Sequence, residues 1–288
     1  SEEAAERLGA DPRGLDRLLN ALAALGFVRK DGGLFRNTEA AETFLNARSP
    51  RYLSGLAHTA NVYKSWATLT DAVRRGGRVT ERPSADSADT RSFIEAMHRR
   101  AKDDADALAA LLDLSGVRRV LDLGGGSGAY SMAFCRAEPG LTAVVLDLPH
   151  VTPLTRRYVA AEGLSERIGT QDGDYHDADF GQGYDLVFLS AIAHINSAAE
   201  NKRLVARAAR ALNPGGRVAV QDFIMDDDRT TPLHGALFAL NMLVNTERGD
   251  PYTESEVRGW MEDAGLTDVL RLDGRDKASL VVGRLAER

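Results

Sequence analysis

The sequence predicts an α/β fold in which a mostly parallel sheet, with an antiparallel last strand, follows a smaller and mainly helical domain. Three observations lead to this prediction. Apolar residues recur at helical spacing from the start of the chain to about residue 112. After residue 116, short apolar runs alternate with helical segments, as in parallel strands joined by crossover helices. The chain closes on two strand-like runs whose link is too short for a crossover helix.

Length and composition predict a globular protein of two domains. The chain has 288 residues, of which 43% are hydrophobic, so it can bury a large core. We place a helical domain at residues 1–100 and an α/β domain at residues 101–288. The formal net charge is -6, and lysines and arginines are scattered among the acids. Without a basic block, no nucleic-acid or anionic-membrane surface is expected, and a small-molecule partner fits better.

The hydropathy pattern predicts no membrane span. The longest apolar stretch, Ala236 to Val244, is interrupted by Asn241 and is far shorter than the roughly 20 residues that a span needs. The only cysteine, Cys135, cannot form an internal disulfide, so a cytoplasmic location is the default expectation. A targeting segment ahead of Ser1 is left open.

The first part of the chain predicts two short helices and a hairpin. One helix covers Glu3 to Leu8, and a second carries leucines on one face from Leu15 to Leu25. Two short strands then flank an Asp-Gly-Gly turn within residues 27–36. This order resembles a winged helix, a fold that often binds DNA. The second helix, however, mixes acids with its arginines, so packing or dimerisation is favoured over phosphate contacts.

The remaining elements follow from the apolar pattern. Helices are predicted at Tyr52–Arg74 and Arg91–Leu112, with a polar surface loop between them at residues 75–90. Buried strands are predicted at residues 120–123, 143–146, 186–189 and 218–220. The closing pair of strands lies at residues 267–272 and 279–283.

The glycine turn at residues 124–128 is the densest chemical signal, because it follows a buried strand and precedes a helix. Glycines there let the backbone approach a ligand closely, and the spacing to Asp147 loosely matches a dinucleotide fingerprint. Asp122 argues against a dinucleotide, because a carboxylate lies poorly beside a pyrophosphate but accepts hydrogen bonds from an ammonium group. S-adenosylmethionine has an ammonium group and no phosphate, so it is the predicted cofactor.

Two further acidic positions fit the same ligand. Asp147 follows the next strand, at the crevice where a ribose would lie. Asp174 and Tyr175 would offer a carboxylate to an adenine amine and an aromatic face to its ring. The acidic run through residues 172–179 lacks a diagnostic metal-ligand spacing, so no metal is predicted.

Five segments in order carry a family resemblance: residues 122–128, 147–151, 173–175, 190–194 and 213–217. Together they resemble the small-molecule O-methyltransferases of the bacterial and plant type, which modify phenols and polyketides. The resemblance implies a Rossmann-like methyltransferase sheet with S-adenosylmethionine bound at it. It also implies a homodimer formed through a winged-helix-like domain that helps to cover the substrate, and a phenolic acceptor from secondary metabolism.

Carried over by position, the resemblance assigns roles to individual residues. It implies that His194 is the general base and that Asp222 assists it. Cofactor contacts are implied for Asp122, Gly124, Gly126, Asp147, Leu148, Asp174, Tyr175 and Ser190. The acceptor pocket is implied to include Phe93, Met97, Asn241, Met242 and Asn245.

The sequence departs from the family pattern at several positions. Ser190 replaces a lysine of the plant enzymes, Ile195-Asn196 replaces an acidic-aromatic pair, and Pro251 stands where a second assisting acid is found. The acceptor, and the choice among O-, N- and C-methylation, therefore stay open. Two other classes remain as alternatives, a nicotinamide-dependent oxidoreductase and a regulator that binds a small ligand and DNA.

Overall fold

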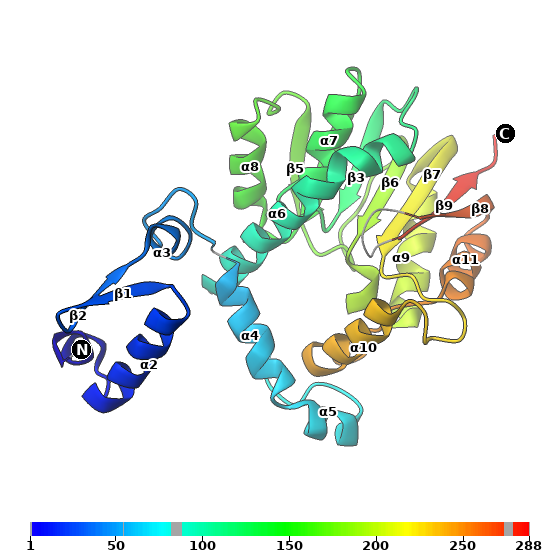
Figure 1. The fold of residues 1–288 in the computed structure, drawn as a ribbon. Helices are drawn as coiled ribbons and strands as arrows, with labels where there is room; N and C mark the ends of the chain where they lie inside the picture. The colour runs from blue at the N-terminus through cyan, green and yellow to red at the C-terminus, as the bar shows by residue number, and fades with distance from the viewer. Residues whose placement is uncertain (1, 54, 82–87, 274–278, 288) are drawn as a thin grey trace. The chain divides into compact units, whose positions relative to one another are not determined.

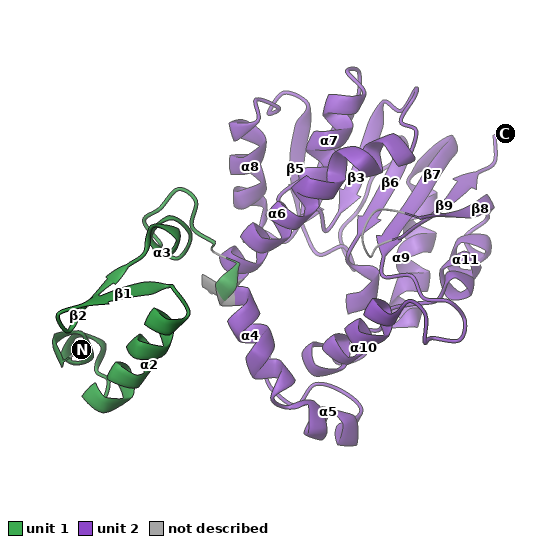
Figure 2. Ribbon diagram, viewed as in Figure 1, with its two compact units in different colours: residues 1–56 green, residues 57–288 purple. Residues whose placement is uncertain are grey.

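The computed structural model describes residues 2–53, 55–81, 88–273 and 279–287 (Figure 1). The chain forms two compact units, residues 1–56 and residues 57–288 (Figure 2). The sequence analysis had divided the chain after residue 100, within helix α6 (Ala88–Leu111). That helix is continuous across the expected boundary and buries Ala105 and Leu108 against the sheet, so it belongs to the second compact unit.

The first unit has the predicted order of two helices and a hairpin. Helices α1 (Glu2–Leu8) and α2 (Pro12–Ala24) precede strands β1 (Val28–Asp31) and β2 (Leu34–Asn37), and α3 (Glu39–Phe44) follows. Helix α2 begins at Asp11, whose carboxylate accepts a hydrogen bond from the Gly14 amide. The hairpin turns through Gly32 and Gly33, both in the left-handed region that favours glycine.

The predicted helix over Tyr52–Arg74 is wrong in its extent. The structure has two helices instead, α4 (Leu56–Trp66) and α5 (Leu69–Arg75). The break falls at Thr68, whose hydroxyl donates to the Ser65 carbonyl at 2.7 Å and so competes with the helical hydrogen bond. Helix α6 confirms the helix predicted at Arg91–Leu112, whereas part of the surface loop predicted before it, residues 82–87, lies outside the described residues.

The second unit is built on a seven-stranded sheet with the order β5-β4-β3-β6-β7-β9-β8. Its strands are β3 (Arg119–Leu123), β4 (Thr142–Asp147), β5 (Ile168–Asp172), β6 (Tyr184–Ser190), β7 (Leu212–Asp222), β8 (Leu266–Asp273) and β9 (Ser279–Leu285). All neighbours pair in parallel except β9, which is antiparallel to both β7 and β8, as predicted. The sequence analysis missed β5, because this edge strand has polar residues where the central strands have a continuous apolar run.

Helices cover both faces of the sheet (Figure 1). On one face, α6, α7 (Ala129–Ala137) and α8 (Thr152–Ala161) enclose a core around Phe134 and Phe188. On the other face, α9 (Ala198–Arg210) and α11 (Glu254–Asp263) enclose a core around Val187 and Trp260. Adjacent residues of β6 thus point into different cores, so both faces of this strand are apolar.

The strand order creates a crevice at the centre of the sheet. The chain moves outward from β3 through β4 to β5, and then returns to the opposite side of β3 with β6. Ligands of open α/β sheets bind at the carboxyl ends of the strands where the order reverses in this way. The short helix η1 (Ala193–Ile195) and helix α10 (Leu233–Asn245) lie after the carboxyl ends of β6 and β7. Among the described residues, none of the helices combines the length and apolarity needed to cross a bilayer.

Candidate active site

The turn after β3 requires glycine at successive positions. Gly124 has φ +63°, and a Cβ placed there would lie 2.8 Å from the Ile192 Cγ2 atom. A Cβ at Gly125 would lie 2.6 Å from the Asp122 carboxyl carbon. Gly128, with φ 75°, then forms the N-cap of α7. Glycine therefore lets the backbone of the turn lie next to the segment that follows β6 and next to a carboxylate, which a residue with a side chain could not do.

Asp122 is fully buried beneath this turn. Its Oδ2 atom accepts a hydrogen bond from the Ser131 hydroxyl at 2.6 Å, while Oδ1 has no donor among the described residues. Burial, with a smaller contribution from the charge of Asp147, raises the pKa of Asp122 to about 7, against the opposing effect of Ser131. A nearby cation or N–H donor would stabilise the ionised form of this carboxyl.

Asp147, at the end of β4, holds the same turn from the other side. Its Oδ2 atom accepts from the Gly126 amide at 2.8 Å, and its Oδ1 atom accepts from the Leu148 amide at 2.7 Å. Burial raises the pKa of this carboxyl, although the two amide hydrogen bonds oppose that effect. Four predicted cofactor residues, Gly124 and Gly126 on the turn and Asp147 and Leu148 beyond it, thus meet at neighbouring strand ends.

The loop after β5 brings Tyr175 to the glycine turn. A Cβ built on Gly124 would lie 3.6 Å from the Tyr175 ring, and the Tyr175 hydroxyl donates to the Asn196 Oδ1 atom at 3.2 Å. Asp174 accepts the His176 amide at 2.8 Å within the loop. Asp172 accepts the Thr152 hydroxyl of α8 at 2.6 Å, and Asp179 accepts the Gly181 amide at 3.0 Å. The described residues contain no group of three or more His, Cys, Asp or Glu side chains placed to hold a metal ion.

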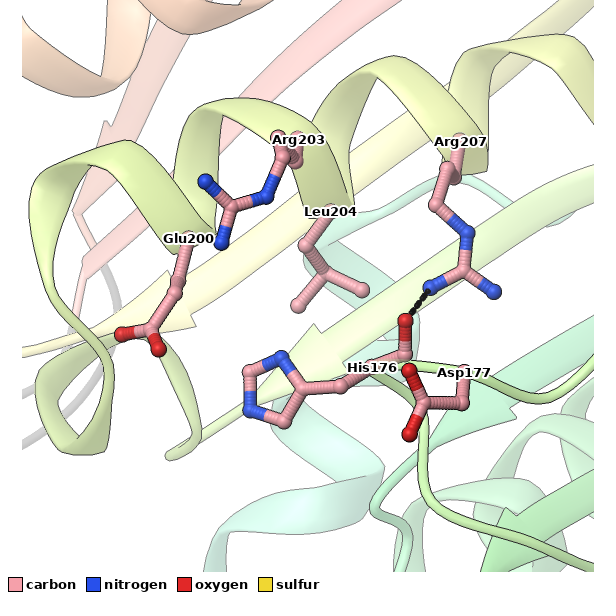
Figure 3. Close-up of a pocket in the computed structure, with 6 residues that line it drawn as sticks. All are labelled: His176, Asp177, Glu200, Arg203, Leu204 and Arg207. Carbon is pink, nitrogen blue, oxygen red and sulfur yellow. Dashed lines mark hydrogen bonds between the residues drawn. The ribbon is translucent and has the colours of Figure 1, made fainter.

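Arg207 of α9 holds this loop in place (Figure 3). Its guanidinium donates to the carbonyls of Tyr175 and His176, each at 2.6 Å, and also to the carbonyl of Ala178. It also lies 4.2 Å from the centroid of the Phe180 ring. The hollow beside it, of about 250 Å³, is lined by His176, Asp177, Glu200, Arg203, Leu204 and Arg207.

We expect Arg207→Ala to weaken cofactor binding without slowing methyl transfer at saturation. The loss of several carbonyl contacts, each worth about 1 kcal/mol, should let the Tyr175 loop move and raise the KM for S-adenosylmethionine roughly threefold to tenfold. Arg203→Ala is the matched control, since Arg203 lies one turn earlier on α9 and lines the same hollow. Steady-state kinetics in which both variants show the same KM would contradict this role.

His194 and Asp222 form a buried pair at the ends of β6 and β7. The His194 Nδ1 atom lies 2.6 Å from the Asp222 Oδ1 atom, and the His194 amide donates to Oδ2 at 3.1 Å. Oδ1 also accepts the Phe223 amide at 2.8 Å. Because a carboxylate only accepts, the imidazole carries its proton on Nδ1, which leaves the Nε2 lone pair to accept a proton.

The backbone around His194 is held in an unusual conformation. Ala191, just before η1, has φ 55°, a left-handed value that costs an L-residue about 1 kcal/mol or more. A side chain at Gly249 would overlap the His194 carbonyl oxygen, so the loop between α10 and α11 packs directly against η1. Asn196, one of the positions that depart from the family pattern, is buried, and its Oδ1 atom accepts a hydrogen bond from the Tyr175 hydroxyl. It therefore links the segment after β6 to the Tyr175 loop.

Ser190 belongs to a neighbouring polar cluster. Its hydroxyl donates to the Gln221 Oε1 atom at 2.5 Å. Burial raises the pKa of Tyr130, and the Gln221 and Ser190 side chains oppose that effect. The sequence analysis did not identify Tyr130 or Gln221. Their position in the sequence offered no signal, because they meet Ser190 only through the pairing of β6 with β7 and the packing of α7.

An aromatic cavity of about 590 Å³ adjoins the pair. Phe238 meets the His194 ring edge to face at 4.9 Å, and the Phe223 ring lies 6.1 Å from it. This volume is in the range of small-molecule sites. The cavity is lined by Trp66, Arg100, Phe223, His234, Leu237, Phe238 and Asn241.

The predicted acceptor residues are distributed around this cavity. Asn241 lines it and accepts the Trp66 indole N–H at 2.9 Å, while Asn245 donates to Asn241 rather than lining the cavity itself. Met242 is buried, and Phe93 contacts the His58 ring; neither they nor Met97 line the cavity. Sequence reasoning missed Leu237 and Phe238, although their helical spacing with Asn241 was a usable signal.

These features define a class of enzyme. The sheet is parallel apart from its antiparallel strand, and its glycine turn lies between the buried Asp122 and the half-buried Asp147. With a histidine-carboxylate pair beside an aromatic cavity, this is the arrangement of a methyltransferase that uses S-adenosylmethionine. Residues 66–267 match the family model of the O-methyltransferase domain, and residues 1–47 match that of the O-methyltransferase dimerisation domain. The chain belongs to this O-methyltransferase family.

Individual relatives agree with this assignment. The chain is 37% identical to 3-hydroxy-5-methyl-1-naphthoate 3-O-methyltransferase of Streptomyces sahachiroi, over 93% of this chain and 79% of the relative. It is 33% identical to the tetracenomycin polyketide synthesis 8-O-methyl transferase TcmO of Streptomyces glaucescens, over 98% of this chain and 86% of the relative. The solved structure of human N-acetylserotonin methyltransferase with S-adenosylmethionine superposes with a TM-score of 0.78 at 26% identity, covering 98% of this chain and 86% of the human chain.

The residues at the crevice fit S-adenosylmethionine, the cofactor of the family. The buried Asp122 has an oxygen without a donor, which suits a cationic ligand. Added Cβ atoms at Gly124 and Gly125 would collide with Ile192 and Asp122, so glycine is what lets the backbone of the turn come close to its neighbours and to a ligand. The predicted alternatives of a nicotinamide cofactor and of a DNA-binding regulator are therefore set aside.

Proposed function

We propose that the enzyme methylates a phenolic hydroxyl of a small natural-product-like molecule, with His194 as the general base. The observation that carries this proposal is the His194–Asp222 pair, whose imidazole packs against Phe238 in the lining of an aromatic cavity. The relatives named above act on a hydroxynaphthoate and on a polyketide, which supports an aromatic acceptor of this kind.

Cofactor and protein have separate tasks in this reaction. S-adenosylmethionine supplies an electrophilic methyl group. We assign the binding of this cofactor to Asp122, Gly124, Gly126, Asp147, Leu148, Asp174, Tyr175 and Ser190. The acceptor rings lie among Phe223, Phe238 and Trp66, which exclude water and orient the hydroxyl. Of the acceptor residues predicted from the sequence, Asn241 lines this cavity. Phe93, Met97, Met242 and Asn245 lie outside its lining, and we assign them to the surroundings of the acceptor site.

The histidine-carboxylate pair moves the proton. His194 Nε2 accepts the hydroxyl proton as the oxygen becomes nucleophilic, and the imidazole then carries a positive charge. Asp222 stabilises that charge and holds the ring in the tautomer with Nδ1 protonated. The oxygen of the acceptor gains the methyl group and its proton stays on His194 until solvent removes it.

Mass spectrometry of phenolic acceptors incubated with the enzyme and S-adenosylmethionine tests the proposal. The expected product gains one methyl group, and nuclear magnetic resonance places that group on oxygen. Attachment to nitrogen or carbon would favour the alternative of N- or C-methylation on the same scaffold. No product with any phenolic acceptor, from a protein that binds the cofactor, would refute the proposal.

The first unit is expected to form a homodimer. The family model of the dimerisation domain matches this unit. The unit also exposes large apolar side chains, among them Leu25, which is 70% exposed, and Leu34, which is 64% exposed. We expect light scattering to find a dimer at micromolar concentration. Leu25→Glu with Leu34→Glu should shift the protein toward monomer, because each adds a charge to a buried interface. A wild-type monomer would contradict the expectation.

The proposed cellular compartment rests on the cysteine content of the chain and not on the fold. We assign the enzyme to the cytoplasm and to secondary metabolism, and the helix, helix, hairpin order of its first unit to a winged helix used for assembly. The buried Cys135, the only cysteine of the chain, needs no oxidising compartment.

A further inference from the structure

Arg100 brings a positive charge to the acceptor cavity. It lies on α6 and lines the cavity, and none of the described side chains that share the lining is a carboxylate. Its guanidinium carbon lies 5.3 Å from the centroid of the Phe223 ring, so the side chain is held against an aromatic wall. Within the described residues, no carboxylate forms an ion pair with Arg100.

The same aromatic ring adjoins the base. Phe223 directly follows Asp222, and its ring centroid lies 6.1 Å from that of His194. The guanidinium and the imidazole are therefore neighbours of one phenyl ring. A molecule whose hydroxyl faces His194 would direct another part of its ring toward Arg100.

We propose that Arg100 selects acceptors that carry a carboxylate, in addition to the hydroxyl that is methylated. This inference rests on the proposed function and specifies its substrate class. A guanidinium presents a planar fork of N–H donors that matches a carboxylate in a bidentate pair, and it is more weakly hydrated than an ammonium group. Trp66, Phe223 and Phe238 enclose the apolar rings, while Arg100 binds the anionic group at the exposed edge of the cavity.

The test compares acids with their neutral esters. Two hydroxynaphthoic acids serve as probes, one with hydroxyl and carboxylate on the same ring and one with them on different rings, each beside its methyl ester. For at least one isomer, the wild-type enzyme should have a KM for the acid about tenfold below that for the ester. Arg100→Gln should raise the KM for the acid about tenfold and leave the KM for the ester within about twofold. A tenfold change is at the low end of the effect of a charge-assisted hydrogen bond, as expected at an exposed site.

Two matched variants sharpen the comparison. Arg100→Lys keeps the charge but loses the bidentate fork, so it should retain part of the preference for the acid. Arg91→Gln removes one positive charge from the same helix away from the cavity lining and should leave both KM values unchanged. The proposal is overturned if the wild type shows no preference for either acid, or if Arg100→Gln affects acid and ester equally.

A binding measurement separates this proposal from the proposed function. Calorimetry with the enzyme saturated by S-adenosylhomocysteine follows acid and ester directly, without any methyl transfer. Binding of the acid that is lost in Arg100→Gln supports the role of Arg100 even where no probe is methylated. Equal binding of acid and ester in the wild type refutes that role even where both probes are methylated on oxygen.

Discussion

Replacement of His194 by alanine should lower kcat about 10² to 10⁴-fold and leave the affinity for S-adenosylmethionine nearly unchanged. This range is the usual contribution of a general base. His194 lies beyond the glycine turn and contacts Phe238 and Asp222, so its removal changes the acceptor side of the site only. Steady-state kinetics with a phenolic acceptor, and calorimetry with S-adenosylhomocysteine, measure the two quantities separately.

Variants of the pair distinguish proton transfer from positioning. Glutamine at position 194 can still donate to Asp222 but is not a base, so His194→Gln should be as slow as the alanine variant. Asp222→Asn should lose a similar factor, because an amide can donate to Nδ1 and thereby favours the tautomer with the proton on Nε2. Added imidazole should restore part of the activity of His194→Ala, whereas a purely structural histidine would show no such rescue.

The acidity of the acceptor offers a second control. A dinitrophenol is acidic enough to arrive at the site already ionised at neutral pH, so its methylation should depend far less on His194 than that of an ordinary phenol. If both acceptors lose the same factor in His194→Ala, proton removal lies elsewhere. A folded variant that binds cofactor and keeps the wild-type rate with ordinary phenols would exclude His194 as the base.

Replacement of Asp147 by alanine should weaken cofactor binding about tenfold to hundredfold. Losing hydrogen bonds to a charged acceptor costs about 1.5 to 3 kcal/mol. In this structure the carboxylate also fixes the turn, because it accepts the amide of Gly126 at 2.8 Å. The variant therefore loses both a ligand contact and the conformation of the glycine turn, whereas kcat at saturating cofactor should fall much less.

Asp147→Asn is the appropriate companion. Its amide oxygen can still accept one of the two backbone N–H groups, but its nitrogen cannot accept the other, so an intermediate loss of affinity is expected. Calorimetry with S-adenosylhomocysteine gives the affinity, and thermal unfolding checks that each variant is folded. Unchanged affinity in a folded Asp147→Ala protein would remove this residue from the cofactor site.

Much of the fold could be predicted from local patterns. Central strands such as β3 and β6 are continuous apolar runs, because both of their faces are buried, and such runs are visible in the sequence. The short link before β9 forbids a crossover helix, which is why the antiparallel last strand was predictable. The edge strand β5 and the break between α4 and α5 were missed, because a polar edge and one threonine hydrogen bond leave little trace in hydropathy.

The candidate site likewise has features that local sequence patterns predict and features that depend on tertiary packing. The sequence alone determined that Asp122 lies at the end of a predicted strand and that Asp147 and His194 follow predicted strands, since motif and strand end are adjacent in the chain. Only the tertiary structure decided that His194 bonds to Asp222, through the parallel pairing of β6 and β7, and that the cavity is lined from four separate segments. Trp66 and Asn241, which meet at 2.9 Å, are 175 residues apart. Local periodicity reports which face of an element is buried, whereas the partners of that face are selected by packing of the whole chain.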